Sequence, residues 1–505
     1  MGSGESASGE ALSRRNDQPK KAARRGVLAI RVSAAVLGAA LAGACASATD
    51  TPAAPETRWV PPAAAVPAAP TPAPPPADFA PEKLANRTIS LYEAIDVALR
   101  NSPVTRQSWL LAQSAAADVG SRRSAYYPAV EADLSGIRQK QSSLGGSVTV
   151  TSTTYTPSLS LNWLLLDLGG RGADLEEARR RLWAVDFAHD ATMNDLMLGV
   201  AQAYYSYQGA RALLVAQEAS LKQARENYAA AEERHRAGVA TIADVLQART
   251  VLSQQKLAYD QVSGQIQTYR GQLATALGVP VDLPVDAAQL PADVHEDASV
   301  ATVDRLIAEA EKSRPDLAAV RARAQAAHAH VASARSAGLP SLSASAFAGR
   351  NVYDFLGESA PYTNNYSLGL LLRVPLFTGL KTLYDTRSAE YLARAADAGA
   401  ESYTQQVLFQ VWNSYFGVQT AAQQVRASKD LLESAQESAE VARGRYREGV
   451  GSILDLLTAE SALANALAQD VTSRAVFLLA VAQLAHDTGT ADTALVPVPP
   501  RKEAP

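Results

Sequence analysis

Apolar positions spaced by three and four residues run through two long stretches of the chain. In the first stretch they are Tyr259, Val262, Ile266, Tyr269 and Leu273, and in the second they are Leu456, Leu463, Leu467 and Val471. This spacing is typical of the seam along which coiled-coil helices pack. It predicts long helices at 171–236, 241–277, 380–447 and 452–486, and shorter helices precede them at 90–125 and 301–338.

The distribution of proline supports these long helices. No proline occurs from Ser158 to Val279 or from Leu376 to Val496, and proline inside a helix breaks the backbone hydrogen-bond ladder. A helix of 66 residues is roughly 100 Å long at 1.5 Å per residue, which no ordinary globular core requires. The helix that returns from it covers about half of that length, so the shorter helix of each half is expected to stack end to end with it.

A second pattern, with a period of two, predicts strands at 127–140 and 154–166, and at 340–353 and 364–376. In the first strand, Val130, Ala132 and Leu134 alternate with Glu131 and Asp133. One apolar and one polar face is typical of a membrane barrel strand between lipid and water. At roughly 3.3 Å per residue, 13 residues span about 40 Å, enough to cross a bilayer at a tilt. Two soluble hairpins with one buried face would give the same pattern.

The chain carries one structural unit twice. The segment Arg236–Ala248 recurs as Arg447–Ala459, 211 residues later, and four other landmarks recur at offsets of 210 to 212. Two similar halves are therefore expected, at 84–290 and 291–490, followed by a tail at 491–505. Four strands cannot close a barrel, and lipid does not tolerate open sheet edges. If the strands span a membrane, at least two copies must share one barrel.

The N-terminal segment is a targeting signal. Basic residues from Lys20 to Arg25 precede a short apolar stretch, Val32 to Ala44, which ends at Cys45. This arrangement resembles a bacterial lipoprotein signal, in which the cysteine becomes the lipidated first residue of the mature chain. An ordinary secretory signal with an incidental cysteine is the alternative. We expect a signal peptide at 1–44, lipidation at Cys45, and a proline-rich tether at 45–83, where 11 of the 26 prolines lie.

Composition narrows the function. Apolar residues make up 47% of the 505 residues and aromatic ones only 6%, which suits closely packed helices. The 47 basic residues nearly balance the 51 acidic ones, which argues against nucleic-acid binding. A single cysteine excludes a disulfide framework. His328 and His330 point roughly 200° apart on a helix and cannot share a metal. Because GxSxG, phosphate-loop and HExxH motifs are also missing, we expect no enzyme, no catalytic residue, no metal and no cofactor.

The whole layout resembles the outer-membrane factor (TolC-like) family, and its lipoprotein drug-efflux branch in particular. The resemblance rests on Tyr127-Pro128 before the first strand, on Leu166–Arg171 at a strand-to-helix joint, and on the paired motif at Arg236–Ala248 and Arg447–Ala459. It implies a homotrimer with a 12-strand β-barrel in the outer membrane of a Gram-negative bacterium, continued by a periplasmic α-helical tunnel. A periplasmic adaptor and an inner-membrane pump for efflux or type I secretion are the implied partners.

The resemblance also implies which residues do the work. The glycine-containing turns would meet the adaptor at the tip through Arg236, Gly238, Val239, Arg447, Gly449 and Val450. Asp244, Tyr446 and Asp455 would form the periplasmic gate, with Tyr446 pairing with Asp244 and Asp455 forming an acidic ring. Plainer explanations remain for both sets. The glycines are also explained as turns alone, and the aspartates as partners of the helix dipole.

Two function classes follow from the sequence. The first is a transport conduit of the kind just described, whose substrate (drug, metal or protein) the sequence leaves open. The second is a lipid-anchored periplasmic coiled-coil scaffold or adaptor without a pore. The alternating strands and the duplication favour the conduit.

Overall fold

The computed structural model describes residues 51–52, 54–59, 87–143, 148–294, 302–355, 358–359 and 362–491. They all belong to one compact unit that begins at Thr51. The predicted signal peptide, Cys45, most of the tether and nearly all of the C-terminal tail lie outside these ranges.

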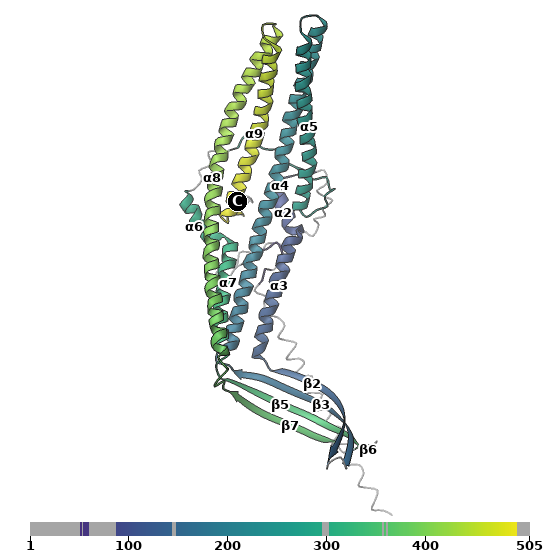
Figure 1. Ribbon diagram of the computed structural model, residues 1–505, viewed down its shortest axis with the longest axis vertical. Coiled ribbons are helices and arrows are strands. Elements are labelled where there is room, and N and C mark those ends of the chain that lie inside the picture. The colour runs from purple at the N-terminus through teal and green to yellow at the C-terminus, as the bar shows by residue number, and fades with distance from the viewer. Residues whose placement is uncertain are drawn as a thin grey trace, which may run out of the picture. The chain divides into compact units, whose positions relative to one another are not determined.

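Four long helices form two hairpins (Figure 1), and their bounds are α4 (Gly170–Arg236), α5 (Ile242–Ala276), α8 (Lys381–Arg447) and α9 (Ile453–Asp487). Each bound lies within one residue of the predicted helix. The helices α4 and α8 each contain 67 residues, and thus extend for about 100 Å. Among the described residues, no helix combines the length and hydropathy that a membrane span requires.

Each shorter helical segment is two helices, so the single helices predicted at 90–125 and 301–338 were wrong. The first is α2 (Leu91–Asn101) followed by α3 (Pro103–Arg123), and the second is α6 (Val303–Ser313) followed by α7 (Pro315–Ser336). A proline occupies the first position of α3 and of α7, where its missing N–H costs nothing but the preceding helix must end. The hydroxyl of Ser102 caps α3 by accepting from the Val104 N–H at 3.2 Å.

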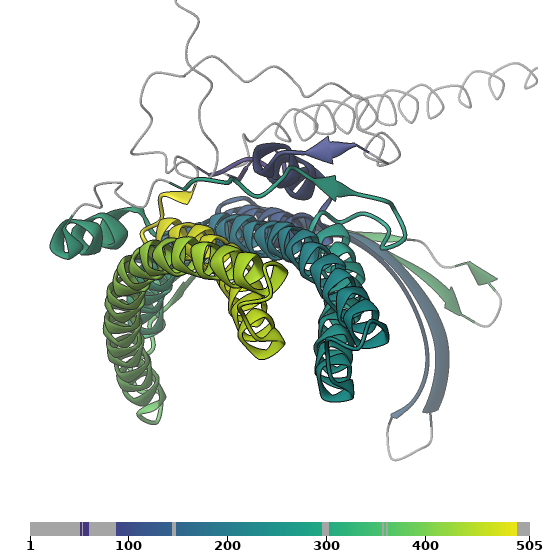
Figure 2. The same ribbon diagram turned by 90° about the horizontal axis from the view of Figure 1, so that it is seen from above.

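The helices pack in two layers along α4. Near the strands, α3 and α7 lie against α4, and α7 also packs against α8. Toward the hairpin turns, α5 and α9 contact α4 instead, and α9 also packs on α8. Seen from above, the two hairpins lie side by side along a curved line (Figure 2). The stacking of a short helix with a returning helix thus occurs as predicted, with α3 and α7 in the place of the short helix.

The strands form one antiparallel sheet that joins the two halves. Its order is β2 (Ala129–Ser143), β3 (Val148–Leu166), β5 (Ser341–Phe355) and β7 (Thr363–Arg373), with the two-residue β6 (Glu358–Ser359) beside the end of β5. The central pair β3–β5 links residues about 190 positions apart, as in Leu159 opposite Ala348. The strand β7 ends before Pro375, which has no N–H to donate. The outer edges of β2 and β7 pair with no other described strand.

The register of the sheet separates apolar from polar side chains. Paired residues share a face. On one face, every second residue along a stretch of each of the four strands is apolar or aromatic. These sixteen residues are Val130, Ala132 and Leu134 of β2; Tyr155, Pro157, Leu159, Leu161 and Trp163 of β3; Leu342, Ala344, Ala346 and Ala348 of β5; and Tyr366, Leu368, Leu370 and Leu372 of β7. We call this the apolar face. At the same levels the other face carries Glu131, Asp133 and mostly serine, asparagine and glycine, with Leu164, Phe347 and Leu371 as apolar exceptions.

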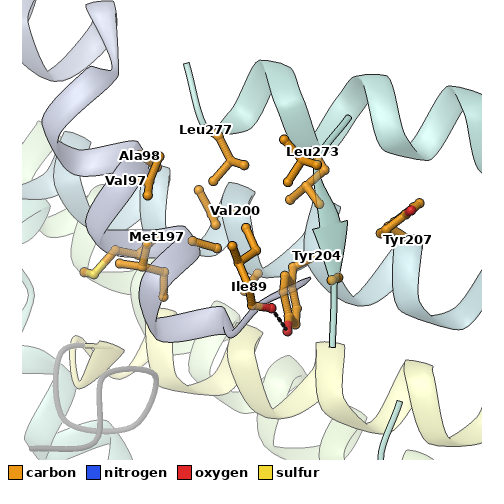
Figure 3. Packing of buried hydrophobic residues seen from close by; sticks show 14 of the residues in the cluster. Ile89, Val97, Ala98, Met197, Val200, Tyr204, Tyr207, Leu273 and Leu277 are labelled. Carbon is orange, nitrogen blue, oxygen red and sulfur yellow. Dashed lines mark hydrogen bonds between the residues drawn. The ribbon is translucent and has the colours of Figure 1, made fainter. Parts of the chain in front are cut away.

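A cluster of buried side chains ties the middle of the helices together (Figure 3). It joins Ile89 and α2 to Met197, Val200 and Tyr204 of α4 and to Leu273 of α5. The Tyr204 hydroxyl donates to the Ile89 carbonyl oxygen at 2.9 Å. Ile89 belongs to β1 (Thr88–Ile89), which pairs in parallel with β4 (Asp286–Ala287). The beginning and the end of the first half are thereby fastened to each other and to the long helices.

The described part of the segment predicted as a tether at 45–83 is bound to the helices and does not act there as a simple spacer. Gln113 of α3 donates to Thr51 Oγ1 at 2.9 Å, and the Trp109 indole donates to the Pro52 carbonyl oxygen at 2.9 Å. Trp59 is 7% exposed and packs on Phe187 of α4 with ring centroids 5.0 Å apart. We call Thr51–Trp59 the strap. Its aromatic and hydrogen-bonding residues bind α3 and α4, which a reading of its proline content did not anticipate.

Candidate functional site

The turn between α4 and α5 is closed by backbone hydrogen bonds around a left-handed glycine. Gly238 has φ of +75°, which favours glycine because a Cβ is strained there. The Gly238 N–H donates to the His235 carbonyl at 2.9 Å and the Val239 N–H to the Arg234 carbonyl at 2.9 Å. This is the Schellman pattern of helix termination. It leaves the Val239 side chain 67% exposed at the tip.

The turn between α8 and α9 repeats this geometry. Gly449 has φ of +76°, and the N–H groups of Gly449 and Val450 donate to the carbonyls of Tyr446 and Arg445 at 3.2 and 3.0 Å. Val450 is 72% exposed. Gly451 is closely confined, because a Cβ there would lie 3.0 Å from the Arg445 Cβ and 3.1 Å from the Tyr446 backbone nitrogen. Two exposed valines beside two exposed arginines, Arg236 and Arg447, thus mark the ends of the two hairpins.

The two aspartates predicted for the gate lie at the starts of the returning helices. Asp244 forms a capping box: its carboxylate accepts from the Thr241 N–H at 2.7 Å, and its own N–H donates to Thr241 Oγ1 at 3.3 Å. Asp455 is exposed, and its N–H donates to Ser452 Oγ at 3.1 Å. Both positions have the geometry of helix N-termini, where a negative charge is favourable.

Tyr446 lies between the two hairpins, but its partner differs from the predicted one. The Arg234 guanidinium of α4 lies 4.5 Å from the Tyr446 ring centroid and donates to the Tyr446 carbonyl oxygen at 2.9 Å. Within the described residues the Tyr446 hydroxyl is buried without a hydrogen-bond partner, so it makes none to Asp244. Burial raises the pKa of Tyr446; Arg234 opposes this shift, and Asp244 adds to it through its charge. The charge of Asp244 therefore acts on Tyr446 from a distance, while the Asp244 carboxylate accepts its hydrogen bond from the Thr241 N–H.

An apolar cluster supports Tyr446 from below. Ala231 of α4, Val245 and Ala248 of α5, and Ile453 and Leu457 of α9 are buried together, and Tyr446 packs against them. The cluster joins both hairpins near their tips. Separating the hairpins would expose this apolar surface to water, so its burial stabilises their contact.

The sequence did not predict two contacts made by charged residues. Arg234 joins the two hairpins through Tyr446, and Arg443 joins α8 to α9 within the second hairpin. Arg234 was not singled out, although it precedes the tip motif by two residues. Arg443 of α8 donates from Nε and Nη2 to one carboxylate oxygen of Glu460 in α9, at 3.0 and 2.7 Å. This pair borders a cavity of about 170 Å³ between the hairpins, also lined by Gln223, Asn227 and Gln255. Their signal in the sequence was weak, because isolated charges on long helices are usually solvated.

An ionic cluster joins four elements nearer the middle of the helices, and its members are mostly buried apart from the exposed Asp195. His486 of α9 contacts Asp195 of α4 through Nε2 and Asp487 through Nδ1, each at 2.9 Å. Burial lowers the pKa of His486, but hydrogen bonds to Asp195 and Asp487 outweigh it and raise the pKa to about 9. The imidazole is therefore charged at neutral pH and holds α9 to α4.

The next contacts in this cluster bring in α7 and α8. Arg314, which precedes α7, donates to the Asp487 carbonyl at 3.1 Å and to Asp316 Oδ1 at 3.0 Å. The Tyr403 hydroxyl of α8 donates to Asp316 Oδ2 at 2.9 Å. Burial raises the pKa of Tyr403 to about 12, with the charge of Asp316 adding to the shift.

The two histidines of α7 contact opposite neighbours, as their spacing predicts. His328 Nε2 lies 2.9 Å from Asp397 Oδ2 of α8, and His330 Nδ1 lies 2.9 Å from Glu177 Oε2 of α4. Each histidine links α7 to a different long helix, so they serve the packing of α7 between α4 and α8.

With this geometry established, the comparison with known proteins decides the family. The model of the family described as outer membrane efflux protein matches residues 94–279 and 306–490. The chain belongs to this family. The two matched blocks lie one in each half of the chain. Members of this family are efflux channel proteins rather than enzymes, so the chain is an outer-membrane channel component and the scaffold alternative is set aside.

Individual relatives agree with this assignment. The chain is similar to protein CyaE of Bordetella pertussis, with 30% identity over 426 residues that cover 83% of this chain and 88% of the relative. It is also similar to the toluene efflux pump outer membrane protein TtgC of Pseudomonas putida, with 29% identity covering 75% of this chain and 78% of the relative. A crystal structure of a membrane protein from Pseudomonas aeruginosa shares the fold, with a TM-score of 0.72, 24% identity, and coverage of 83% and 98%.

Proposed function

We propose that three copies of this chain form one channel by pairing β7 of each copy with β2 of the next. These two strands are the free edges of the described sheet, and they run in opposite directions along it. Their pairing continues the antiparallel pattern without interruption. Three sheets of four strands give a closed barrel of 12 strands, within the even-numbered range of outer-membrane barrels. Closure removes the unpaired edges that lipid does not tolerate.

The separation of the two faces is the observation that carries this proposal. Apolar side chains on the apolar face are exposed to an unusual degree: 79% for Leu134, 85% for Tyr366 and 83% for Leu368. A soluble sheet would bury such a face under a second layer, yet no described helix contacts it appreciably. Lipid covers an apolar surface of this kind, and the polar face with Glu131 and Asp133 then lines a water-filled interior.

The helices prolong this channel and end in the docking and gating surfaces. In the proposal the tips at Gly238 and Gly449 meet a periplasmic adaptor that links the channel to an inner-membrane pump. Arg236, Val239, Arg447 and Val450 offer exposed apolar and basic side chains for that contact. Closure of the tunnel rests on the contact of Tyr446 with Arg234 across the two hairpins, and three copies of Asp455 add negative charge at the opening.

A lipid anchor at Cys45 fits the position of the strap. Thr51 comes only six positions after Cys45, a reach of about 20 Å when extended. Thr51 is bound at Gln113 of α3, 13 residues before the helical turn at Tyr126, or about 20 Å along a helix. The acyl chains would thus enter the leaflet from which the strands emerge. Substrates cross the outer membrane through the channel, and their chemical class is set by the pump.

Cross-linking between copies tests the shared barrel. Leu370→Cys is combined in turn with Ala132→Cys, Leu134→Cys and Gly136→Cys, all at positions on the same face of the sheet, and outer-membrane fractions are oxidised. We expect one of the three pairs to give a ladder of dimer and trimer on non-reducing gels. The single substitutions serve as controls because the only native cysteine is Cys45.

The outcome that contradicts the proposal is equally clear. If all three pairs stay monomeric while the protein remains in the outer-membrane fraction, β2 and β7 do not meet between copies. A monomeric particle that stays soluble without detergent would reject the membrane-spanning sheet itself.

A further inference from the structure

We propose that basic residues at the outer end of the apolar face bind the phosphate groups of outer-leaflet lipid headgroups. The inference rests on the proposed function, because it requires that the apolar face meets lipid. It concerns Arg138 and Lys140 of β2 and Arg350 of β5, which belong to no contact that the channel mechanism uses.

Register places these three residues on the lipid side of the sheet. In β2 the even-numbered residues from Val130 to Leu134 form part of the apolar face, and Arg138 and Lys140 continue the same alternation after Gly136. In β5, Arg350 follows Ala348 on that face. The acidic residues of β2, Glu131 and Asp133, lie on the opposite face. The charges of one strand are therefore sorted, with basic side chains toward lipid and acidic ones toward the interior.

Their distance along the strands matches the far interface of a bilayer. Arg138 comes eight residues after Val130, and Arg350 eight residues after Leu342, or about 26 Å along each strand. At a strand tilt of about 40° the rise is roughly 20 Å, and Lys140 lies about 5 Å higher. The apolar band of an outer-membrane barrel is about 25 Å tall. A cation at this height leaves the hydrocarbon and enters the headgroup layer.

The basic residues of β2 and β5 lie along a line that is inclined to the pairing rows of the sheet. On β2 the last apolar position before a basic residue is Leu134, whereas on β5 it is Ala348, the row partner of Tyr366 on β7 and of Leu159 on β3. Arg138 shares its row with Thr153 on β3 and Asp354 on β5. The basic position on β5, Arg350, lies four residues before that row, with the apolar Val352 between them on the same face. A boundary that is inclined to the rows is what strand tilt requires, and it brings Arg138 and Arg350 to similar heights.

The side chains present the chemistry that phosphate binding needs. Arg350 Nε donates to Asn364 Oδ1 at 2.9 Å, and its guanidinium lies 4.4 Å from the Tyr362 ring centroid. These contacts orient the guanidinium, while its two terminal amino groups make no other bond to the described residues. Arginine binds phosphate through such paired donors. One acidic residue, Asp354, also lies at this end of the apolar face. It pairs with Thr153, which in turn pairs with Arg138. The three basic residues outnumber it.

Closing the trimer would turn the three residues into a belt. Between Arg138 and Arg350 of one copy lies one strand, β3. Between Arg350 of one copy and Arg138 of the next lies also one strand, β7. The basic side chains would therefore recur at even spacing around the barrel. A belt of this kind suits a lipid that carries several phosphates and is packed densely around the channel, such as the phosphorylated glycolipid of the outer leaflet.

Lipid retention tests the inference. The detergent-solubilised protein is mixed with bisphosphorylated lipid A, and bound lipid is counted by native mass spectrometry. We expect the wild type to retain lipid A. The Arg138→Gln/Arg350→Gln variant should bind lipid A at least about tenfold more weakly. The matched control is Arg373→Gln, which removes an arginine from the opposite face of the same sheet and should leave binding unchanged.

Two further ligands distinguish the source of the phosphate. Dephosphorylated lipid A should bind wild type and variant equally weakly, and equimolar inorganic phosphate should not displace lipid A. Equal retention of lipid A by the double variant would overturn the inference, as would tight binding of the dephosphorylated lipid. Full displacement by inorganic phosphate would assign the site to a free anion instead. Recovery of trimer from the outer-membrane fraction is measured for the wild type and for every variant. If the wild type gave no trimer, the proposed channel would be contradicted, whereas the lipid site would not.

Discussion

The guanidinium of Arg234 covers the ring of Tyr446 at 4.5 Å and donates a hydrogen bond of 2.9 Å to the Tyr446 carbonyl oxygen. These two contacts connect the first helical hairpin to the second close to the tips. The Tyr446 hydroxyl, by contrast, has no hydrogen-bond partner among the described residues. The ring and the backbone of Tyr446 therefore hold the hairpins together, and the hydroxyl contributes little to that contact.

This difference predicts opposite results for two substitutions. Arg234→Gln removes the cation–π contact and the charged hydrogen bond, together on the order of 1–3 kcal/mol, so single-channel conductance in planar bilayers should rise. Tyr446→Phe keeps the ring and should leave conductance unchanged. If Tyr446→Phe alone opened the channel as widely as Arg234→Gln, the hydroxyl would have to bond in the assembled channel, and the pairing with Asp244 implied by family resemblance would be restored.

The two tip glycines should not tolerate substitution, because both have a positive φ. Gly238→Ala and Gly449→Ala each place a Cβ at φ near +75°, at a cost of about 1 kcal/mol per turn. We expect a lower melting temperature in detergent and weaker binding to the adaptor. Gly444→Ala is the matched control, because Gly444 lies inside α8 with open space around it, and alanine there favours the helix by about 0.5–1 kcal/mol. A melting temperature that falls as much for Gly444→Ala would contradict this explanation.

His486 predicts how stability depends on pH. Its pKa of about 9 in the folded chain lies above the ordinary value of 6.5, so the charged imidazole stabilises the fold. That stabilisation, on the order of 1–3 kcal/mol, is complete below about pH 6.5 and is lost as the pH rises through 9. Thermal melts of the wild type should therefore show falling stability between pH 7 and pH 10. The slope should shrink in His486→Gln, and an unchanged slope would place the titrating group elsewhere.

The strap should be held to α4 mainly by the ring of Trp59. Trp59→Ala removes the ring contacts with Trp183 and Phe187 and should cost about 3 kcal/mol of local stability. Limited trypsin digestion should then cleave after Arg58 much faster than in the wild type. Trp109→Phe offers a milder control, because it loses only the hydrogen bond to the Pro52 carbonyl, about 1 kcal/mol. Equal cleavage rates in all three proteins would contradict the role of Trp59.

The sequence allowed the regular elements to be predicted because each carries its own periodicity. The bounds of α4 and α8 follow from proline-free stretches and from glycines that can occupy only a turn. The breaks before Pro103 and Pro315 were missed, although proline at the first helical position is a common start signal. In each case a strongly amphipathic helix precedes the proline and a helix with little amphipathic pattern follows it. The change of pattern therefore coincides with the proline, and both signals marked the boundary.

The contacts of the candidate site were predictable only in part. Gly238, Gly449 and their caps follow from local backbone chemistry, and the structure places them at the two turns. The pairing of Tyr446 depends on how two hairpins approach each other, which no local pattern records. Residues 51–59 show the same limit, because Trp59 binds α4 through contacts more than 120 positions away. Tertiary packing, not propensity, decides those partners.

Charge sorting on β2 gives a last prediction, about ion selectivity. Glu131 and Asp133 lie on the polar face, so three copies would place six carboxylates inside the channel near its inner end. Neighbouring carboxylates attract cations and repel anions. Reversal potentials in a salt gradient should therefore indicate cation selectivity, and Glu131→Gln with Asp133→Asn should reduce it. Lys140→Gln changes a charge on the same strand but on the lipid side, so it should leave selectivity unaltered. A selectivity that responds to Lys140 and ignores the two acidic residues would mean that the sheet faces the opposite way.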